Sequence, residues 1–214
     1  MEQLHRNQPV LTRGAPVGGA RGSVIFLHGR GATAEDILGI ADELQFSDLA
    51  YLAPQAARQT WYPNSFLAPI ANNEPWLSSA LELVGSIVEK LGHAGVPTTR
   101  VVILGFSQGA CLATEFVARN PERYGGLVAF TGGLIGPMGG LPAHSGNLEG
   151  TPCFLGAGDP DPHVPWERVN ESASVLRSIG AEVTLRRYPG LGHTINRDEI
   201  GEAKRILQTL GPVP

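Results

Sequence analysis

Short apolar runs recur along the chain, and many of their residues are β-branched. Runs of this length, bounded by polar or glycine-rich segments, are typical of buried strands. They lie at 24–27, 49–52, 101–104, 127–130 and 153–155. Farther along, Val183 and Leu185 alternate with polar residues, which predicts one more strand. The sequence therefore predicts at least six strands.

Helical spacing fills the intervals between these strands. Apolar residues recur three and four positions apart in 77–91, 169–179 and 200–210. Asn120-Pro121 should end the helix that follows residue 107, and Gly180 is placed to cap the helix that starts near residue 166. Strands that alternate with helices predict an α/β fold, with a mostly parallel sheet covered by helices on both faces.

Length and charge narrow the class of protein. The 214 residues are 42% hydrophobic and 17% charged, which fits one domain over 1–214, with 1–22 as an N-terminal edge strand or hairpin. The net charge of −4 and the lack of a Lys/Arg run argue against nucleic acid or an anionic membrane as partner. No apolar window resembles a signal peptide or a membrane span. We expect a cytoplasmic protein with a small-molecule partner, and a homodimer remains open.

The two cysteines are predicted to be core thiols. Cys111 falls on the helix after residue 107, and Cys153 lies inside an apolar strand. A free thiol in such places serves as a small core residue. We favour this interpretation over a disulfide, and over Cys111 as a nucleophile.

The strand over 101–104 leads directly into Gly105-Phe106-Ser107-Gln108-Gly109 and then into a helix. A serine flanked by glycines between a strand and a helix is the pattern of a nucleophile elbow. The turn is so sharp that the serine must adopt a strained backbone conformation, and the glycines avoid clashes there. Ser107 is therefore the candidate nucleophile.

A serine nucleophile at an elbow needs an acid and a histidine farther along the chain. His193 follows the last predicted strand in a Gly-flanked loop, so we favour it over His163 as the base. The loop after the strand at 153–155 carries Asp159 and Asp161, and one of them should face the imidazole. The other should accept backbone hydrogen bonds and hold the loop.

Two cofactor hypotheses are disfavoured. Asp159, Asp161 and His163 alternate as metal ligands could, but no further cluster completes a coordination shell, so we expect no metal. The segment 29–34 imitates a dinucleotide fingerprint, but the next strand ends without the acid that would hold a ribose. We therefore expect no cofactor.

Two long irregular segments, 53–75 and 131–150, are candidates for binding loops or a mobile lid. They contain apolar side chains that could line a groove, although each could equally be core. These are Trp61, Phe66, Leu67, Met138 and Leu141. Backbone amides should stabilise the developing oxyanion, one from Gln108 at the start of the helix and one from the loop 28–32.

As an ordered set, five segments resemble the phospholipase/carboxylesterase family of small α/β-hydrolases, which includes bacterial carboxylesterases and acyl-protein thioesterases. They are 26–31, 53–55, 105–110, 159–165 and 192–195. The resemblance implies an α/β-hydrolase fold without a cap domain, no cofactor, and Ser107, Asp161 and His193 as the triad. It also implies that the amides of Arg30 and Gln108 form the oxyanion hole.

The segment 55–76 resembles the bacterial esterase members more than the protein-deacylating ones. Activity on acylated proteins is therefore not expected. The expected activity is hydrolysis of carboxylic esters, and of thioesters as a further class, through an acyl-enzyme, and the acyl chains should be short to medium because 214 residues leave loops rather than a lid domain to cover them. A lactonase or peptidase with the same triad remains an alternative. So does a catalytically silent hydrolase fold that serves as a binding module.

Overall fold

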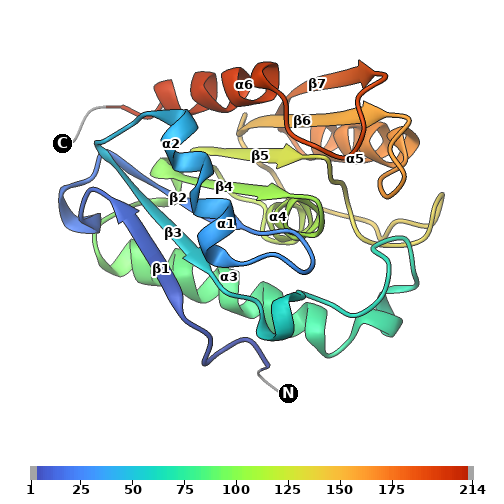
Figure 1. The fold of residues 1–214 in the computed structure, drawn as a ribbon, viewed down its shortest axis with the longest axis horizontal. Helices are drawn as coiled ribbons and strands as arrows, with labels where there is room; N and C mark the ends of the chain where they lie inside the picture. Colours follow the sequence, from blue (N-terminus) through green and yellow to red (C-terminus); the bar gives the residue numbers. More distant parts are fainter. Residues whose placement is uncertain (1–3, 212–214) are drawn as a thin grey trace.

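The computed structural model describes residues 4–211, and a seven-stranded sheet forms its centre, in the order β1-β3-β2-β4-β5-β6-β7 (Figure 1). The strands are β1 Val10–Gly14, β2 Gly22–Leu27, β3 Leu49–Pro54, β4 Val101–Phe106, β5 Gly126–Phe130, β6 Pro152–Asp159 and β7 Glu182–Pro189. All neighbouring pairs are parallel except β1 with β3. The predicted mostly parallel sheet is confirmed, and β1 is its antiparallel edge strand.

In the described part of the chain, six α-helices accompany the sheet: α1 Ala34–Leu38, α2 Ile40–Leu44, α3 Trp76–His93, α4 Gln108–Arg119, α5 Trp166–Ser178 and α6 Arg197–Gln208. Short 3-10 turns lie at Val17–Gly19, Ala57–Gln59, Ile70–Asn73 and Thr98–Arg100. The predicted ends near residues 120 and 180 are confirmed, because α4 stops at Arg119 and Gly180 has a φ of 86° after α5. Within residues 4–211, no helix has both the length and the apolar character that a membrane crossing requires.

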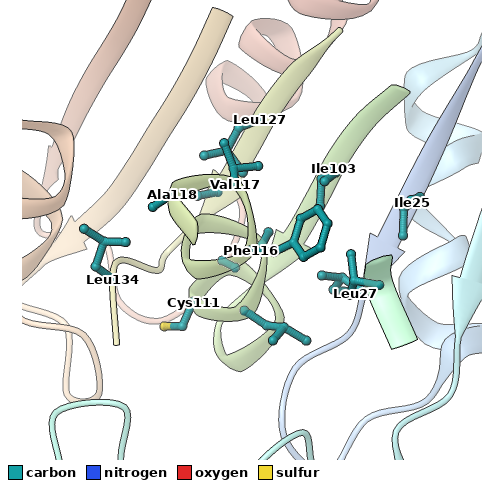
Figure 2. Packing of buried hydrophobic residues seen from close by; sticks show 14 of the residues in the cluster. Ile25, Leu27, Ile103, Cys111, Phe116, Val117, Ala118, Leu127 and Leu134 are labelled. Carbon is teal, nitrogen blue, oxygen red and sulfur yellow. The ribbon is translucent and has the colours of Figure 1, made fainter. Parts of the chain in front are cut away.

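Alternating side chains of the strands divide the core between the two faces of the sheet. Ile25 and Leu27 pack with α3, α4 and α5, whereas Val24 and Phe26 pack with α1, α2 and α6. Figure 2 shows the first of these clusters, with Phe116 of α4 directed at the strands. The inner strands are therefore apolar at almost every position, as expected of a parallel sheet that is covered on both sides.

The connection from β5 to β6 contains no helix in the described chain, unlike the predicted regular alternation. Glycines and prolines dominate residues 131–150 and disfavour a helix there. Side chains of α4 and α5 hold the first part of this loop. Arg168 donates from Nη1 to the Leu134 carbonyl at 2.9 Å, and Glu115 accepts from the Ile135 amide at 2.9 Å. Residues 134–135 are thus tied to the body of the protein rather than free to act as a lid.

Candidate active site

Ser107 occupies the turn between β4 and α4 with φ 54° and ψ −119°. A conformation of this kind costs about 1–3 kcal/mol and persists only where the surroundings enforce it. The two flanking glycines allow the turn. A Cβ at Gly105 would overlap the backbone of Gly109, and a Cβ at Gly109 would overlap the Leu27 carbonyl of β2. The predicted elbow and its strained serine are confirmed.

His193 contacts both Ser107 and Asp161. Its Nε2 lies 2.8 Å from Oγ of Ser107, and its Nδ1 lies 2.8 Å from Oδ2 of Asp161. Since the carboxylate only accepts, Nδ1 carries the proton, and Nε2 is left to accept the proton of the serine hydroxyl. The three side chains that the sequence assigns to nucleophile, base and acid thus form one continuous hydrogen-bond chain.

The Asp161 carboxylate is shielded from solvent, and its second oxygen also has partners. Oδ1 accepts the backbone N–H groups of His163 and Val164 at 2.7 and 2.8 Å. Burial opposes ionisation, but these two amides and His193 outweigh it and lower the pKa of Asp161 below its ordinary value. Asp161 is therefore an anion at neutral pH and is suited to stabilise a protonated His193.

In the described residues, no backbone N–H group donates to the Asp159 side chain, contrary to the prediction. Its carboxylate pairs instead with the guanidinium of Arg187. The reason is that β6 extends through Asp159, beside β7, so the acid meets a side chain of the neighbouring strand. Asp161 thus both holds the loop and faces the imidazole, two tasks that the sequence had divided between the two acids.

Two aromatic rings flank the imidazole of His193. The Phe106 ring lies 5.1 Å away between centroids, and His163 lies edge-on at 4.8 Å. The His193 side chain is only one-fifth exposed. These rings, together with Asp161, restrict the orientation of the imidazole over Ser107.

The backbone N–H groups of Arg30 and Gln108 donate no hydrogen bond to another group in residues 4–211. Both residues line the same pocket as Ser107. Gln108 is the first residue of α4, so its amide also carries the positive end of the helix dipole. Two free amides beside a nucleophile can receive the negative charge that develops on a carbonyl oxygen.

The buried side chain of His28, to which the sequence analysis gave no role, holds the loop that carries the Arg30 amide. Its Nε2 accepts the Ala56 N–H at 3.0 Å, so its Nδ1 donates to the Gly29 carbonyl at 2.8 Å. Burial lowers the pKa of His28 and keeps it neutral, as these two bonds require. Since the Gly29 carbonyl and the Arg30 N–H belong to one peptide group, His28 sets the direction of that N–H.

The pocket around Ser107 has a volume of about 470 Å³. Its apolar lining comes from Tyr62, Phe66, Phe106, Cys111 and Val164. Burial raises the pKa of the Cys111 thiol to about 12, so the thiol stays protonated and contributes only its surface. Cys111 and Cys153 are both buried and free of disulfides, as predicted.

Of the five residues predicted to line a groove, Phe66 lines this pocket and the other four lie elsewhere. Trp61 is fully buried, and its indole N–H donates to the His28 carbonyl at 2.8 Å. Leu67 and Leu141 pack against the core, and Met138 is 48% exposed beside Arg168. A loop sequence reveals its apolar residues but not the side toward which each one turns.

The Gln108 side chain anchors the loop that carries Tyr62. Its Oε1 accepts the Trp61 N–H at 3.0 Å, and its Nε2 donates to the Tyr62 carbonyl at 2.8 Å. One residue therefore presents a free backbone amide to the pocket and fixes the pocket wall with its side chain. The two terminal atoms of an amide side chain suit this double contact.

No group of three His, Cys, Asp or Glu side chains in residues 4–211 has the arrangement of a metal site. Asp159 and Asp161 have the separate partners described above, and His163 packs against His193. The arrangement thus brings together a serine hydroxyl, an imidazole, a carboxylate and two free backbone amides, which are the groups that acyl transfer can use.

The chain is similar to a known protein family and to solved structures. A profile of the family described as Phospholipase/Carboxylesterase matches residues 15–211. A solved phospholipase/carboxylesterase from Dyadobacter fermentans is 44% identical, with 95% of this chain and 96% of that chain covered and a TM-score of 0.89.

Two curated relatives are more distant in sequence. Acyl-protein thioesterase 1 of Yarrowia lipolytica is 25% identical, over 87% of this chain and 90% of its own length. A probable carboxylesterase of Arabidopsis thaliana, SOBER1-like, is 26% identical, over 85% of this chain and 76% of its own length. The similarity to both relatives thus extends over most of the chain rather than over isolated motifs.

Proposed function

The chain belongs to the phospholipase/carboxylesterase family, and from this premise we propose that it hydrolyses short- to medium-chain carboxylic esters through an acyl-enzyme on Ser107. Its fold is that of the α/β-hydrolases, and its relatives are named as carboxylesterases and thioesterases. The observation that carries the proposal is the position of His193, within 2.8 Å of both Ser107 and Asp161.

In the first half of the reaction, Nε2 of His193 takes the proton of the Ser107 hydroxyl as Oγ attacks the ester carbonyl. The carbonyl oxygen becomes an oxyanion that accepts the N–H groups of Arg30 and Gln108. Asp161 stabilises the imidazolium without taking its proton. The imidazolium then protonates the departing alcohol, which leaves an acyl group bonded to Oγ.

In the second half, water replaces the alcohol. His193 removes a proton from the water as its oxygen attacks the acyl carbon, and the same two amides receive the charge of the second oxyanion. Collapse of this intermediate returns the proton to Oγ of Ser107 and releases the carboxylic acid. No metal or organic cofactor takes part in these steps.

Acyl length should be limited by the pocket beside Ser107, whose lining includes Phe66 and Val164. Thioesters form a second candidate class, which the similarity to an acyl-protein thioesterase favours. Esters and thioesters form tetrahedral intermediates of the same kind, from which the alcohol or the thiol leaves. Both classes would therefore use the same groups of the protein.

A fluorophosphonate probe tests the proposal on folded protein. We expect covalent labelling at Ser107, mapped by peptide mass spectrometry, and no labelling of Ser107→Ala. A panel of 4-nitrophenyl esters of increasing acyl length, with thioesters and lactones beside them, then defines the substrate class. Absence of labelling in the folded wild-type protein would favour the catalytically silent alternative.

A further inference from the structure

We propose that the Arg30 side chain forms a subsite for a carboxylate on the substrate, so that the preferred esters carry a negative charge near the scissile bond. The inference rests on the proposed function, since it concerns the pocket around Ser107. It adds a role for the Arg30 side chain, which is distinct from that of the Arg30 backbone amide.

The Arg30 guanidinium is held in place at the pocket but is only partly satisfied. It donates from Nη1 to the Pro63 carbonyl at 2.8 Å and from Nη2 to the Asn64 carbonyl at 2.6 Å. It also lies over the Tyr62 ring, 5.9 Å from the centroid. A guanidinium has five N–H groups. Two are used here, and the other three have no partner in residues 4–211.

The carbonyl groups that hold Arg30 are themselves fixed. Asn73 is fully buried, and its Oδ1 accepts the Asn64 N–H at 2.9 Å while its Nδ2 donates to the Ser65 carbonyl at 3.0 Å. The Asn64 side chain donates to the Asn72 carbonyl at 2.6 Å. Because this loop is ordered by side chains, the guanidinium loses less conformational entropy when it binds an anion.

The charged side chains that line the pocket favour the binding of an anion. Within the described chain, no Asp or Glu lines the pocket, and Arg30 is its only Lys or Arg. Asp161 lies behind His193 with a side chain that is shielded from solvent, and the acids of α1, Glu35 and Asp36, stay outside the pocket lining. The N-terminus of α4 adds its partial positive charge on the same side.

Among Asp, Glu, Lys and Arg side chains, Arg30 is therefore the only one that lines the pocket in the described residues, although the whole chain carries a net charge of −4. No acidic side chain forms an ion pair with Arg30 in residues 4–211, so no internal anion would have to be displaced. A planar carboxylate matches the donor geometry of a guanidinium, and a charge-assisted bond of this kind is stronger than a neutral one. A neutral ester of the same shape would leave the three N–H groups without an anionic acceptor.

Two matched substrate pairs test the proposal. The acyl pair is mono-4-nitrophenyl adipate and the neutral 4-nitrophenyl 6-oxoheptanoate. The alcohol pair is 4-carboxyphenyl butyrate and the neutral 4-carbamoylphenyl butyrate. For each pair, the ratio of kcat/KM for the anionic over the neutral ester is compared between wild type and Arg30→Gln, so the intrinsic reactivity of the esters cancels.

We expect Arg30→Gln to lower this ratio about 3- to 10-fold in one of the pairs, which identifies the side of the scissile bond that carries the anion. Arg30→Lys should retain part of the ratio. The control is Arg177→Gln, which removes the same charge from the last turn of α5, where Arg177 donates to the Val183 carbonyl far from the pocket lining. This control should leave both ratios unchanged.

Salt dependence of the wild-type enzyme gives a second measurement that needs no variant. The preference for the anionic ester should weaken between low salt and about 0.5 M KCl, because Arg30 is exposed and added ions screen its charge. Unchanged ratios in Arg30→Gln, or a wild-type ratio insensitive to salt in both pairs, would overturn the subsite alone. If wild type cleaves neither member of either pair, the proposed ester hydrolysis fails with it.

Discussion

Nε2 of His193 lies 2.8 Å from Oγ of Ser107, although 86 positions separate the two residues in the chain. Ser107→Ala removes the oxygen that would attack the substrate and leaves the imidazole and its acid in place. We expect kcat for 4-nitrophenyl butyrate to fall by on the order of 10⁴ to 10⁶. Circular dichroism and thermal melts should show a folded protein, and residual activity above about a tenth of wild type would exclude Ser107 as the nucleophile.

Asp161→Asn tests the acid. An asparagine oxygen can still accept the amides of His163 and Val164, but its NH₂ group would face Nδ1 of His193 and favour the wrong tautomer. We expect kcat to fall by about 10³- to 10⁴-fold in a folded protein, measured by steady-state kinetics.

Asp159→Asn is the matched control for this substitution. It removes only a partly exposed pair with Arg187, so we expect a change in unfolding free energy within about 1 kcal/mol and near-normal kcat. If Asp159→Asn abolished activity and Asp161→Asn kept it, the two assignments would have to be exchanged.

Gly109→Ala and Gly201→Ala should change the free energy of unfolding in opposite directions. A Cβ at Gly109 would overlap the carbonyls of Leu27 and His28, so we expect a loss of at least about 3 kcal/mol. Gly201 lies inside α6 with open space around it, so alanine there should add about 1 kcal/mol through helix propensity. Urea unfolding measures both changes, and equal stabilities would contradict the close approach of α4 to β2.

Glu199 should make stability depend on pH. Burial, opposed by the Asn196 N–H, raises the pKa of Glu199 from 4.5 to about 7. Between these values the native state holds a proton that the unfolded chain has lost, so stability falls as pH rises and then levels off above the native pKa. Glu199→Gln has no such proton and can still accept the Asn196 amide.

The unfolding free energy of Glu199→Gln minus that of wild type should therefore grow from pH 4.5 to about 7 by on the order of 2 kcal/mol. Burial lowers the pKa values of His5 and His28, so these two residues make stability rise with pH. Their contribution is the same in wild type and in Glu199→Gln, and it therefore cancels in the difference. Urea titrations at a series of pH values measure it. A difference that stays constant with pH would show that Glu199 is ionised in the native state.

Acyl length should affect kcat/KM through the pocket volume of about 470 Å³. We expect short and medium acyl esters to be better substrates than long ones, since the pocket lining offers loops rather than a separate lid domain. The measurement is kcat/KM for 4-nitrophenyl esters below their aggregation threshold. A steady rise to the palmitoyl ester would refute the expected limit.

The strands were predictable because a covered parallel sheet leaves long apolar runs, as in β4, where Val101–Leu104 are all buried. The positions of Ser107 and His193 were predictable for a different reason, since each follows the carboxyl end of a strand in the parallel part of the sheet, β4 or β7. The predicted alternation of strands and helices breaks between β5 and β6, where the segment 131–150, predicted to be irregular, is held by tertiary contacts from Arg168 and Glu115.

The contacts around the site were harder to predict. Asp159 and Asp161 are only two positions apart in the sequence. Asp159 is the last residue of β6, whereas Asp161 lies in the loop beyond the strand and reaches His193. His28 and Trp61 looked like any histidine or loop tryptophan, and their roles depend on hydrogen bonds between distant segments. Sequence periodicity contains no information about such partners.

Gln108 has a consequence for how this enzyme could change its substrate range. Its side chain holds the segment with Trp61 and Tyr62, and its backbone begins α4 immediately after Ser107. Gln108 therefore connects the wall of the pocket to the turn that carries Ser107. Mutations that reshape the 61–62 segment to admit a larger acyl group would also displace the amide that we propose as an oxyanion donor, so we expect altered specificity to come with a lower turnover rate unless Gln108 adapts at the same time.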